Sequence, residues 1–364
     1  MDFTNDKRVV LTLDAGGTNF VFSAIQGGTE IVNPVSKPSN ADNIDRCLAA
    51  LVNGFKEVKE QLAEEPVAIS FAFPGPADYP NGIIGDLPNF PAFKGGVALG
   101  PFLKEKFKLP VFINNDGDLF AYGEALAGML PAINSDLQNA GSQKQYKNLV
   151  GLTLGTGFGA GLVFNNQLLV GDNSIAAEVW LMSNRVNSEF NAEEIVSTRS
   201  LIAEYKKVAT AGQQDFMPFD IYKIAMGEKE GNKEAAKKAF EFFGRGIGDV
   251  VANLITLFDG IVVMGGGITG AQELYMPSVL KELSRSFQGR SSEATPRPVQ
   301  AVYNYSNEQQ KEDFLKPRFT KIQVPQSNST VIYDSKPRVV IAHSETGASK
   351  SIQLGAYIFA LQKL

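Results

Sequence analysis

The chain has 364 residues, 44% of them hydrophobic and 20% charged, which is typical of a globular protein with about two domains. Its 34 Lys and Arg residues stand against 39 Asp and Glu residues, and the net charge of −5 argues against nucleic acid as a partner. Cys47 is the single cysteine and His343 the single histidine, which excludes intrachain disulfides, multi-thiolate zinc sites and multi-histidine metal sites.

The N-terminal sequence has no apolar signal core, and no apolar run reaches the roughly 18 residues of a membrane-spanning helix. The nearest candidate, residues 251–264, is interrupted by Asp259. We therefore expect a cytoplasmic protein without a membrane partner.

The first part of the chain alternates between strand and helix patterns. Strands are predicted at 8–13, 20–25 and 30–35, and residues 14–18 form a glycine-containing turn between the first two. The elements predicted next are a helix at 44–62, a strand at 67–73, a helix at 99–107 and a strand at 111–113.

The pattern then restarts, because a strand at 149–154 again runs into glycines, at 155–161. The sequence Leu-x-Leu-Asp-x-Gly at 11–16 and Leu-x-Leu-Gly-x-Gly at 152–157 stand in matching contexts, which predicts a duplicated α/β unit. The further predicted elements are strands at 162–164 and 167–170, helices at 192–209, 220–226 and 233–258, a strand at 261–264, a helix at 272–287, a strand at 339–342 and a helix at 349–361. The polar stretch 289–337 fits either a hairpin that decorates the unit or a partly ordered loop.

The two glycine turns have the composition of a phosphate site. Gly16 and Gly17 let backbone N–H groups approach phosphate oxygens, the Thr18 hydroxyl donates, and Asp14 can hold Mg²⁺ directly or through water. The second turn offers Gly155, Thr156 and Gly157 in the same way. Tight hairpin turns alone would explain both sequences equally well.

Other phosphate-binding motifs fit less well. The sequence has no G-x-x-x-x-G-K-[ST] motif, and its single histidine leaves no H-R-D segment for a protein kinase. A dinucleotide fingerprint occurs at Gly265-x-Gly267-x-x-Gly270, after a predicted strand and before a predicted helix. An NAD-dependent oxidoreductase is therefore an alternative function.

A polar triplet, Asn114-Asn115-Asp116, follows a predicted strand and precedes a helical pattern. Asp116 could cap that helix, but ligands also gather at the carboxyl ends of strands in open α/β sheets. Both interpretations apply.

In their order and spacing these segments resemble the ROK family of bacterial sugar kinases and sugar-responsive repressors, within the actin-like ATPase fold. The matching segments are 13–19, 74–78 with 87–90, 109–116 with Gly123-Glu124, 154–159 and 262–268. The resemblance covers most of residues 8–288, and the order of the five motifs is its specific feature.

The resemblance implies a role for each matching residue. Asp14 would serve the Mg²⁺ and ATP phosphates, and Asp116 would be the general base that takes the proton of the attacking sugar hydroxyl. The residues that would cradle the phosphates or lie by the adenosine are Gly16, Gly17, Thr18, Gly155, Thr156, Gly157, Gly265, Gly266 and Gly267. The residues that would line the sugar site are Gly75, Asn89, Asn115, Asp116, Glu178 and Glu193.

The resemblance also implies an architecture and an activity. We expect a duplicated actin-like ATPase, or ribonuclease H-like, two-domain α/β fold with a cleft between the domains. The N-terminal domain would comprise 1–115, with the helix 349–364 packing back on it, and the larger domain 116–348 would include the elongated insertion 289–337. The expected function is ATP-dependent phosphorylation of a hexose or hexose derivative, with ATP and Mg²⁺ as cofactors and a homodimer as the assembly.

One segment departs from the family pattern. Family kinases carry Gly-Glu-x-Gly-His followed by a cysteine-rich zinc loop, whereas this chain reads Ala-Glu-Val-Trp-Leu at 177–181. Glu178 is retained, Leu181 replaces the histidine, and without the cysteines no structural zinc is expected. The resemblance therefore does not identify the sugar, and a non-catalytic sensor of sugar or nucleotide is the alternative within the family.

Overall fold

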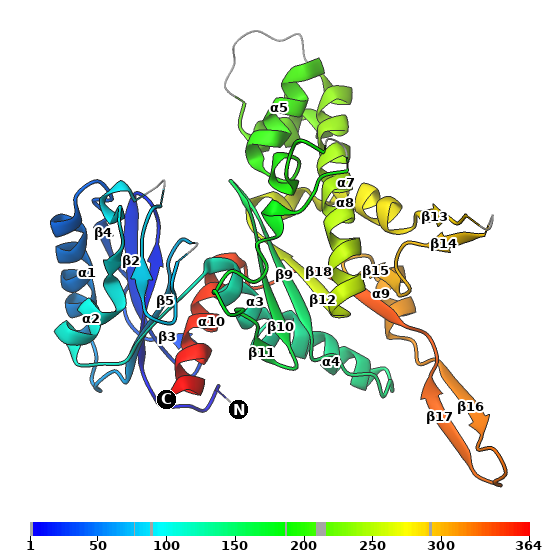
Figure 1. The fold of residues 1–364 in the computed structure, drawn as a ribbon, viewed down its shortest axis with the longest axis horizontal. Coiled ribbons are helices and arrows are strands. Elements are labelled where there is room, and N and C mark those ends of the chain that lie inside the picture. The colour runs from blue at the N-terminus through cyan, green and yellow to red at the C-terminus, as the bar shows by residue number, and fades with distance from the viewer. Residues whose placement is uncertain (1–2, 76, 88–89, 186–187, 209–215, 291–292) are drawn as a thin grey trace. The chain divides into compact units, whose positions relative to one another are not determined.

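The computed structural model describes residues 3–75, 77–87, 90–185, 188–208, 216–290 and 293–364. The chain divides into two compact units, each built on a mixed sheet with helices (Figure 1). Unit 1 comprises Met1–Gly128, Gly161–Ala177 and Thr346–Leu364, and unit 2 comprises Met129–Ala160 and Glu178–Glu345.

Unit 1 contains a sheet in the order β3-β2-β1-β5-β8, with β4 also paired to β2. β1 and β2 are antiparallel, whereas β1, β5 and β8 run parallel. The strands are β1 (Val10–Ala15), β2 (Asn19–Gln26), β3 (Thr29–Glu30), β4 (Val35–Pro38), β5 (Ala68–Ala72) and β8 (Val111–Asn114). The predicted strand at 30–35 is wrong, because only its two ends, at β3 and β4, pair with β2.

The core of unit 1 is rich in phenylalanine. Phe22 and Phe55 meet edge to face with centroids 5.0 Å apart, and Phe73 lies 4.9 Å from Phe90. These rings come from β2, from helix α1 (Ile44–Lys59) and from the segment that follows β5, so α1 is fixed on the sheet by aromatic packing. The remaining elements of this part are the hairpin of β6 (Ile83–Ile84) and β7 (Val97–Ala98), the 3₁₀ turn η1 (Pro91–Phe93) and α2 (Leu99–Phe107).

Two helices that are distant in the sequence cross on unit 1. Helix α3 (Asp116–Leu126) packs against α10 (Ala348–Lys363), and α10 also contacts β1, β5 and β8. A Cβ on Gly123 would lie 2.0 Å from the Ser351 carbonyl oxygen, and one on Gly355 would lie 2.0 Å from that of Leu119. This contact groups residues 116–128 with unit 1, whereas the predicted domain boundary lies after residue 115.

Unit 2 repeats the strand order of unit 1. Its sheet runs β11-β10-β9-β12-β18-β15, so a hairpin of consecutive strands is again followed by parallel strands. The strands are β9 (Leu149–Leu154), β10 (Phe158–Phe164), β11 (Gln167–Leu168), β12 (Ile261–Gly265), β15 (Ala301–Asn304) and β18 (Arg338–His343). The predicted duplication is confirmed, and β15 is an added edge strand.

The helices of unit 2 are dominated by the long α7 (Lys233–Phe258), which packs along α8 (Gln272–Leu283), as Figure 1 shows. Helices α5 (Thr198–Val208) and α6 (Pro218–Met226) also contact α7. The other helical elements are α4 (Met129–Asn139) and the 3₁₀ turns η2 (Val179–Leu181), η3 (Ala192–Glu194) and η4 (Gly267–Ala271).

The polar stretch after α8 is built of short regular elements. β13 (Ser286–Gln288) pairs with β14 (Ala294–Pro296), and β15 joins the main sheet before α9 (Glu308–Leu315). β16 (Phe319–Gln323) and β17 (Thr330–Asp334) form a hairpin that extends away from the rest of unit 2 in Figure 1. Of the two open interpretations of 289–337, the decorating hairpin is the better one.

Within the described residues, none of the helices is both long and apolar enough to cross a membrane.

Candidate functional site

The first glycine turn of unit 1 is tightly constrained. A Cβ on Gly16 would lie 2.8 Å from the Asn19 carbonyl oxygen, so the turn between β1 and β2 requires glycine at this point. Ser39, directly after β4, fixes the turn, since its hydroxyl donates to the Gly17 carbonyl oxygen at 2.5 Å and its N–H to that of Thr18 at 2.9 Å. Both interactions use carbonyl groups, and they leave the N–H groups of the turn for a ligand.

Asp14, at the end of β1, is suited to a hard cation. Its side chain is solvent-accessible and has no hydrogen-bond or ion-pair partner among the described residues, while desolvation by the surrounding protein raises its pKa. The described part of the chain has no group of three or more His, Cys, Asp and Glu residues placed to hold a metal. One free carboxylate fits Mg²⁺, which commonly uses one or two protein carboxylates together with phosphate and water oxygens.

Asn115 and Asp116 form the beginning of α3. Asn115 is the N-cap, with φ of −70° and ψ of 151°, and its Oδ1 accepts from the Gly117 N–H at 2.8 Å. The same N–H lies 2.9 Å from Asp116 Oδ1. The N-cap is therefore Asn115 and not Asp116, to which the capping interpretation applied; Asp116 lies in the first turn with one oxygen held by the backbone.

The carboxyl group of Asp116 has a raised pKa. Desolvation by the protein is the main cause, and the negative charge of Asp14 adds to it, although backbone hydrogen bonds act in the opposite direction. The side chain is nevertheless accessible to solvent. An accessible carboxylate with a raised proton affinity is what a general base requires.

Gly75 and Asn115 come together at the side chain of Tyr79. The buried Tyr79 hydroxyl donates to the Phe73 carbonyl oxygen at 3.0 Å, and Asn115 Nδ2 donates to the Tyr79 oxygen at 3.4 Å. A Cβ on Gly75 would lie 2.2 Å from that hydroxyl. Asn89, the other expected sugar residue of this part, lies outside the described residues.

In unit 2 the two glycine segments lie next to each other. The Gly155 N–H donates to the Gly157 carbonyl oxygen at 3.1 Å, which closes the turn, and Thr156 is exposed at its tip. Gly266 has φ of 101°, and a Cβ there would lie 2.3 Å from the Leu154 carbonyl oxygen. This contact requires glycine at 266 and explains why strand β12 brings residues 265–267 to the turn at 155–157.

Glu193 also lies at this turn. Its Oε2 accepts from the Phe158 N–H at 2.9 Å, and its Oε1 accepts from Arg199 Nη2 at 2.7 Å. A Cβ on Gly157 would lie 2.7 Å from Oε2. The carboxylate of Glu193 therefore links the start of β10 to α5, and a side chain at 157 would displace it.

The segment that departs from the family pattern has a strained backbone. Ala177 adopts φ of 65°, in the left-handed region that favours glycine, at the position where the family motif has glycine. The next residue, Glu178, accepts a hydrogen bond from Trp180 Nε1–H. Leu181, which replaces the family histidine, is 58% exposed.

The structure thus gathers the expected residues into two sets. In unit 1, Asp14 is electrostatically coupled to Asp116, and Asn115 lies by Gly75. In unit 2, the turn 155–157 lies against Gly266 and Glu193. Three supporting residues were missed, namely Ser39, Tyr79 and Arg199, because each acts through a contact with a residue distant in the sequence. Only Tyr79 had a usable signal, since it follows the Pro-Gly-Pro segment closely.

Comparison with known proteins places these features in a family. The model of the ROK family matches residues 10–309. A glucokinase of Thermotoga maritima is 27% identical over 290 residues, covering 74% of this chain and 84% of that protein. An N-acetyl-D-glucosamine kinase of Vibrio cholerae is 26% identical over 274 residues, covering 72% of this chain and 85% of that protein.

Solved structures agree in fold. The crystal structure of a glucokinase from Parabacteroides distasonis is 51% identical, covers 100% of both chains and has a TM-score of 0.92. A ROK family glucokinase from Streptomyces griseus, solved with glucose and AMPPNP, is 17% identical, covers 96% of this chain and 98% of its own, and has a TM-score of 0.62. At 17% identity, the similarity to the Streptomyces griseus structure shows a shared fold and nothing further.

Proposed function

Because the chain belongs to the ROK family, we propose that it is a glucose kinase in which Asp116 is the general base. Its fold is the actin-like ATPase fold, and its activity is ATP-dependent phosphorylation of a hexose or hexose derivative. Glucose is the proposed acceptor because the structure that is 51% identical over the whole chain is that of a glucokinase. The dinucleotide fingerprint at 265–270 has no further support, since the motifs around it belong to the kinase pattern.

The observation that carries the proposed chemistry is the pair of carboxylates in unit 1. Asp116 has a raised pKa and an accessible oxygen, so it can accept the proton of the sugar hydroxyl as that oxygen attacks the γ-phosphoryl group. Gly75 and Asn115 would orient the sugar, with Tyr79 holding the Asn115 amide. Positioning of this kind supplies much of the acceleration in phosphoryl transfer.

The nucleotide would be held by the glycine turns. The backbone N–H groups of 16–18 and 155–157 are suited to phosphate oxygens, and Thr18 and Thr156 have exposed hydroxyls with no partner among the described residues. Residues 265–267 would lie by the adenosine. Mg²⁺ would be held at Asp14 with phosphate and water oxygens, where it would neutralise charge on the phosphates.

Glu178 and Glu193 would contribute to the sugar site from unit 2. The Arg199 and Phe158 contacts fix the Glu193 carboxylate, and the glycine-like backbone at Ala177 supports the alignment of Glu178 with the family motif. The exposed Leu181 leaves an apolar group where family members present an imidazole, so sugar preference is where this chain should differ from them.

Two expectations on cellular context belong to the same proposal. We expect the reaction to take place in the cytoplasm, where ATP is available. A homodimer is supported by the exposed apolar side chains of the β16–β17 hairpin, among which Phe319 is 49% and Val331 54% exposed. Light scattering coupled to size exclusion tests the dimer, and a monomer at micromolar concentration would contradict it.

The experiment that tests the function is a measurement of ADP release with Mg–ATP and a panel of sugars. The panel contains glucose, mannose, fructose, allose, glucosamine, N-acetylglucosamine and N-acetylmannosamine. We expect the highest kcat/KM with glucose. A higher value with another sugar would contradict the acceptor, and no turnover with any sugar would contradict the kinase.

The control for this assay is the variant Asp116→Asn, purified in parallel. A glucokinase carried over from the expression host would give equal turnover in both preparations. Turnover that belongs to this chain is confined to the wild-type protein.

A further inference from the structure

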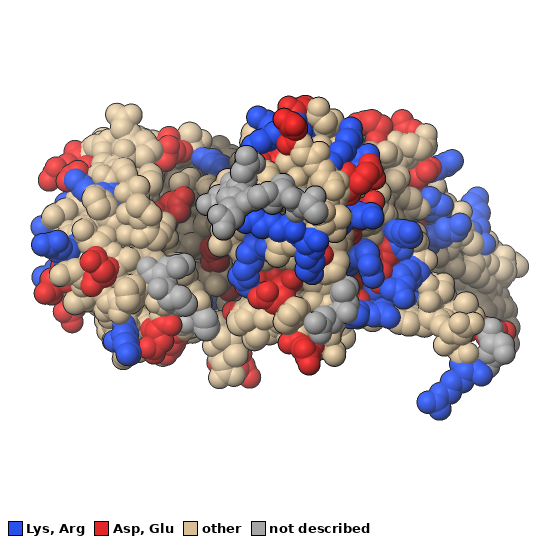
Figure 2. All heavy atoms as spheres, turned by 90° about the horizontal axis from the view of Figure 1, so that it is seen from above, with Lys and Arg blue, Asp and Glu red and all other residues tan. Residues whose placement is uncertain are grey.

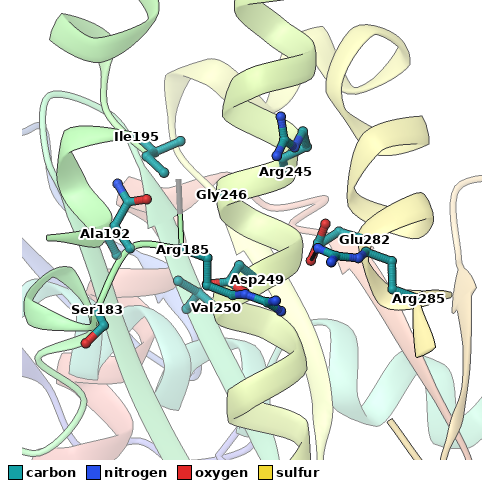
Figure 3. Close-up of a pocket in the computed structure, with 11 residues that line it drawn as sticks. Ser183, Arg185, Ala192, Ile195, Arg245, Gly246, Asp249, Val250, Glu282 and Arg285 are labelled. Carbon is teal, nitrogen blue, oxygen red and sulfur yellow. Dashed lines mark hydrogen bonds and ion pairs between the residues drawn. The ribbon is translucent and has the colours of Figure 1, made fainter. Parts of the chain in front are cut away.

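A small polar cavity lies in unit 2, and none of the glycines of the turn 155–157 lines it. It has a volume of about 210 Å³ and is lined by α7, the end of α8 and residues of the segments 183–185 and 192–195 (Figure 3). Its floor is formed by the carboxylates of Asp249 on α7 and Glu282 on α8, and Ser183, Ala192 and Ile195 form the wall opposite α8.

Arginines surround this floor. Arg297, on the segment after β14, is buried and binds both carboxylates, with Nη2 at 2.5 Å from Asp249 and Nη1 at 2.5 Å from Glu282. Arg185 lies 3.8 Å from Asp249, and Arg285 lies 2.8 Å from Glu282. The side chains of Arg185 and Arg285 remain about half exposed, at 45% and 49%. Each guanidinium group can therefore still donate hydrogen bonds to a ligand in addition to its carboxylate.

Arg245 adds a charge without a counterion. It lies one helical turn before Asp249 on the same face of α7, yet the buried Arg297 occupies that carboxylate. Among the described residues Arg245 has no ion-pair partner, and its side chain is exposed at the cavity. Counting the buried Arg297, four guanidinium groups stand against two carboxylates, an excess of two positive charges, and Arg185, Arg245 and Arg285 among them line the cavity.

Unit 2 also carries basic side chains over a wider surface. Figure 2 shows Lys and Arg side chains gathered over one face of unit 2, although the whole chain has a net charge of −5. Like charges gathered at one place on an acidic protein repel one another, and a bound anion relieves that repulsion.

We propose that this cavity binds a small anion that carries a phosphate group. A phosphate bears a charge of about −1.5 to −2 at neutral pH, which matches the excess around the cavity, and its oxygens fit the paired N–H groups of guanidinium forks. The volume is below the roughly 300–1,000 Å³ of pockets for drug-sized ligands, so inorganic phosphate or a small sugar phosphate fits better than a nucleotide. This site is separate from the proposed phosphate turns.

The position of the cavity connects it to the proposed sugar site. Ala192 and Ile195 line the cavity, and between them Glu193 reaches the Phe158 N–H at the glycine turn. A ligand in the cavity would thus contact the same short segment that carries Glu193, from the other side.

The test is calorimetric titration of the full chain with inorganic phosphate and, separately, with glucose 6-phosphate, without nucleotide or sugar. The variants are Arg245→Gln and the double variant Arg245→Gln/Arg285→Gln, and the matched control is Arg46→Gln, an exposed arginine on α1 of unit 1. We expect the affinity of the tighter probe to fall at least threefold in the single variant and tenfold in the double variant, with the control unchanged.

Because Arg245 forms no ion pair with any of the described residues, the single variant keeps the test valid even if the double variant folds poorly. A preference for glucose 6-phosphate that the variants abolish identifies a sugar phosphate as the ligand, and equal affinities identify free phosphate. The proposal is overturned if the wild type binds neither probe, or if the Arg245 variant binds both as tightly as the control does. Neither result depends on kinase activity, so it is distinguishable from a failure of the proposed function.

Discussion

The carboxylate of Asp116 is the proposed general base of the reaction. Replacing it by Asn removes the proton acceptor but keeps the size of the side chain and an oxygen for the Gly117 N–H. We expect kcat to fall by about 10²–10⁴-fold, the usual contribution of a general base. Asp45→Asn, which removes an exposed charge from the first turn of α1, is the matched control and should leave kcat unchanged.

The stability of the same variant separates a chemical role from a structural one. The raised pKa means that the folded state binds the Asp116 proton more tightly than the unfolded chain does, so stability falls as pH rises through that range and stays lower above it. A neutral Asn avoids this cost. Thermal unfolding at neutral pH should therefore give a Tm for Asp116→Asn at or above that of the wild type, and a clearly lower Tm would indicate a structural role.

The pH dependence of turnover follows from the same pKa. The base must be ionised, so kcat/KM should be lost as pH falls through the raised pKa, at a higher pH than the usual aspartate value of 3.8 would give. Since Asp14 contributes to the shift, Asp14→Asn should lower the pKa of Asp116. Carbon NMR titration of the Asp116 carboxyl group in both proteins measures this directly, and an equal pKa in the two would contradict the coupling.

Gly75 tests the geometry of the proposed sugar side. In Gly75→Ala the new methyl group would meet the Tyr79 hydroxyl, which is buried and hydrogen-bonded, so Tyr79 and the Asn115 amide must shift. We expect KM for the sugar to rise about tenfold or more, with a smaller change in kcat. Gly270→Ala, where a Cβ meets nothing within 4 Å, is the comparison, and equal KM values in the two variants would contradict the role of this contact.

At the scale of elements, the crossing of α3 and α10 holds unit 1 together. Gly123 and Gly355 let the two helices approach until each glycine lies against a carbonyl group of the other helix. Replacing either by Ala forces the helices apart, and we expect a loss of about 1–3 kcal/mol of stability for each variant. Urea unfolding of both single variants and the double variant measures it.

The double variant Gly123→Ala/Gly355→Ala tests whether the two glycines act through the same helix crossing. Once one methyl group has separated the helices, a second at the same crossing should cost less, so the two losses should not add. Additive losses would show that the two glycines act independently.

The sequence predicted elements well where a local pattern decided them. The predicted bounds of α2, α7 and β9 match the structure, because each has a continuous apolar periodicity or a continuous buried run. The helix predicted at 192–209 begins instead at Thr198, since residues 192–194 form a 3₁₀ turn that holds Glu193 at β10. Such a tertiary contact leaves no periodic signal.

The same limit applies to the candidate site. The glycine turns and a helix cap within 114–116 are local features and could be predicted, although the predicted cap was Asp116 and the observed one is Asn115. The juxtaposition of Gly266 with Leu154, in contrast, depends on strand pairing between β9 and β12. The polar stretch 289–337 was the least predictable part, because its short strands bury few apolar side chains.

At the scale of the whole molecule, the stability of the unit 1 sheet depends on residues 346–364, which include α10. The Ser70 hydroxyl donates to the Ala356 carbonyl oxygen at 2.7 Å, and the Gly27 N–H donates to Tyr357 at 2.9 Å. In a chain that ends at Glu345 we expect amides of β5 and β8 to exchange hydrogen at least 100-fold faster, since α10 no longer covers them. Exchange followed by mass spectrometry tests this, with a chain that ends at Gln362 as control.

The three-segment construction of unit 1 also affects how the protein is made. On the ribosome, residues 1–128 emerge first, but the helix that covers β1, β5 and β8 emerges only after unit 2 has been synthesised. At about 5–20 residues per second, the apolar face of a nascent unit 1 waits more than ten seconds for its cover. Contacts as distant as that between Arg8 and Leu361 also make folding slow, so the nascent chain should be a client of chaperones that bind exposed apolar surface.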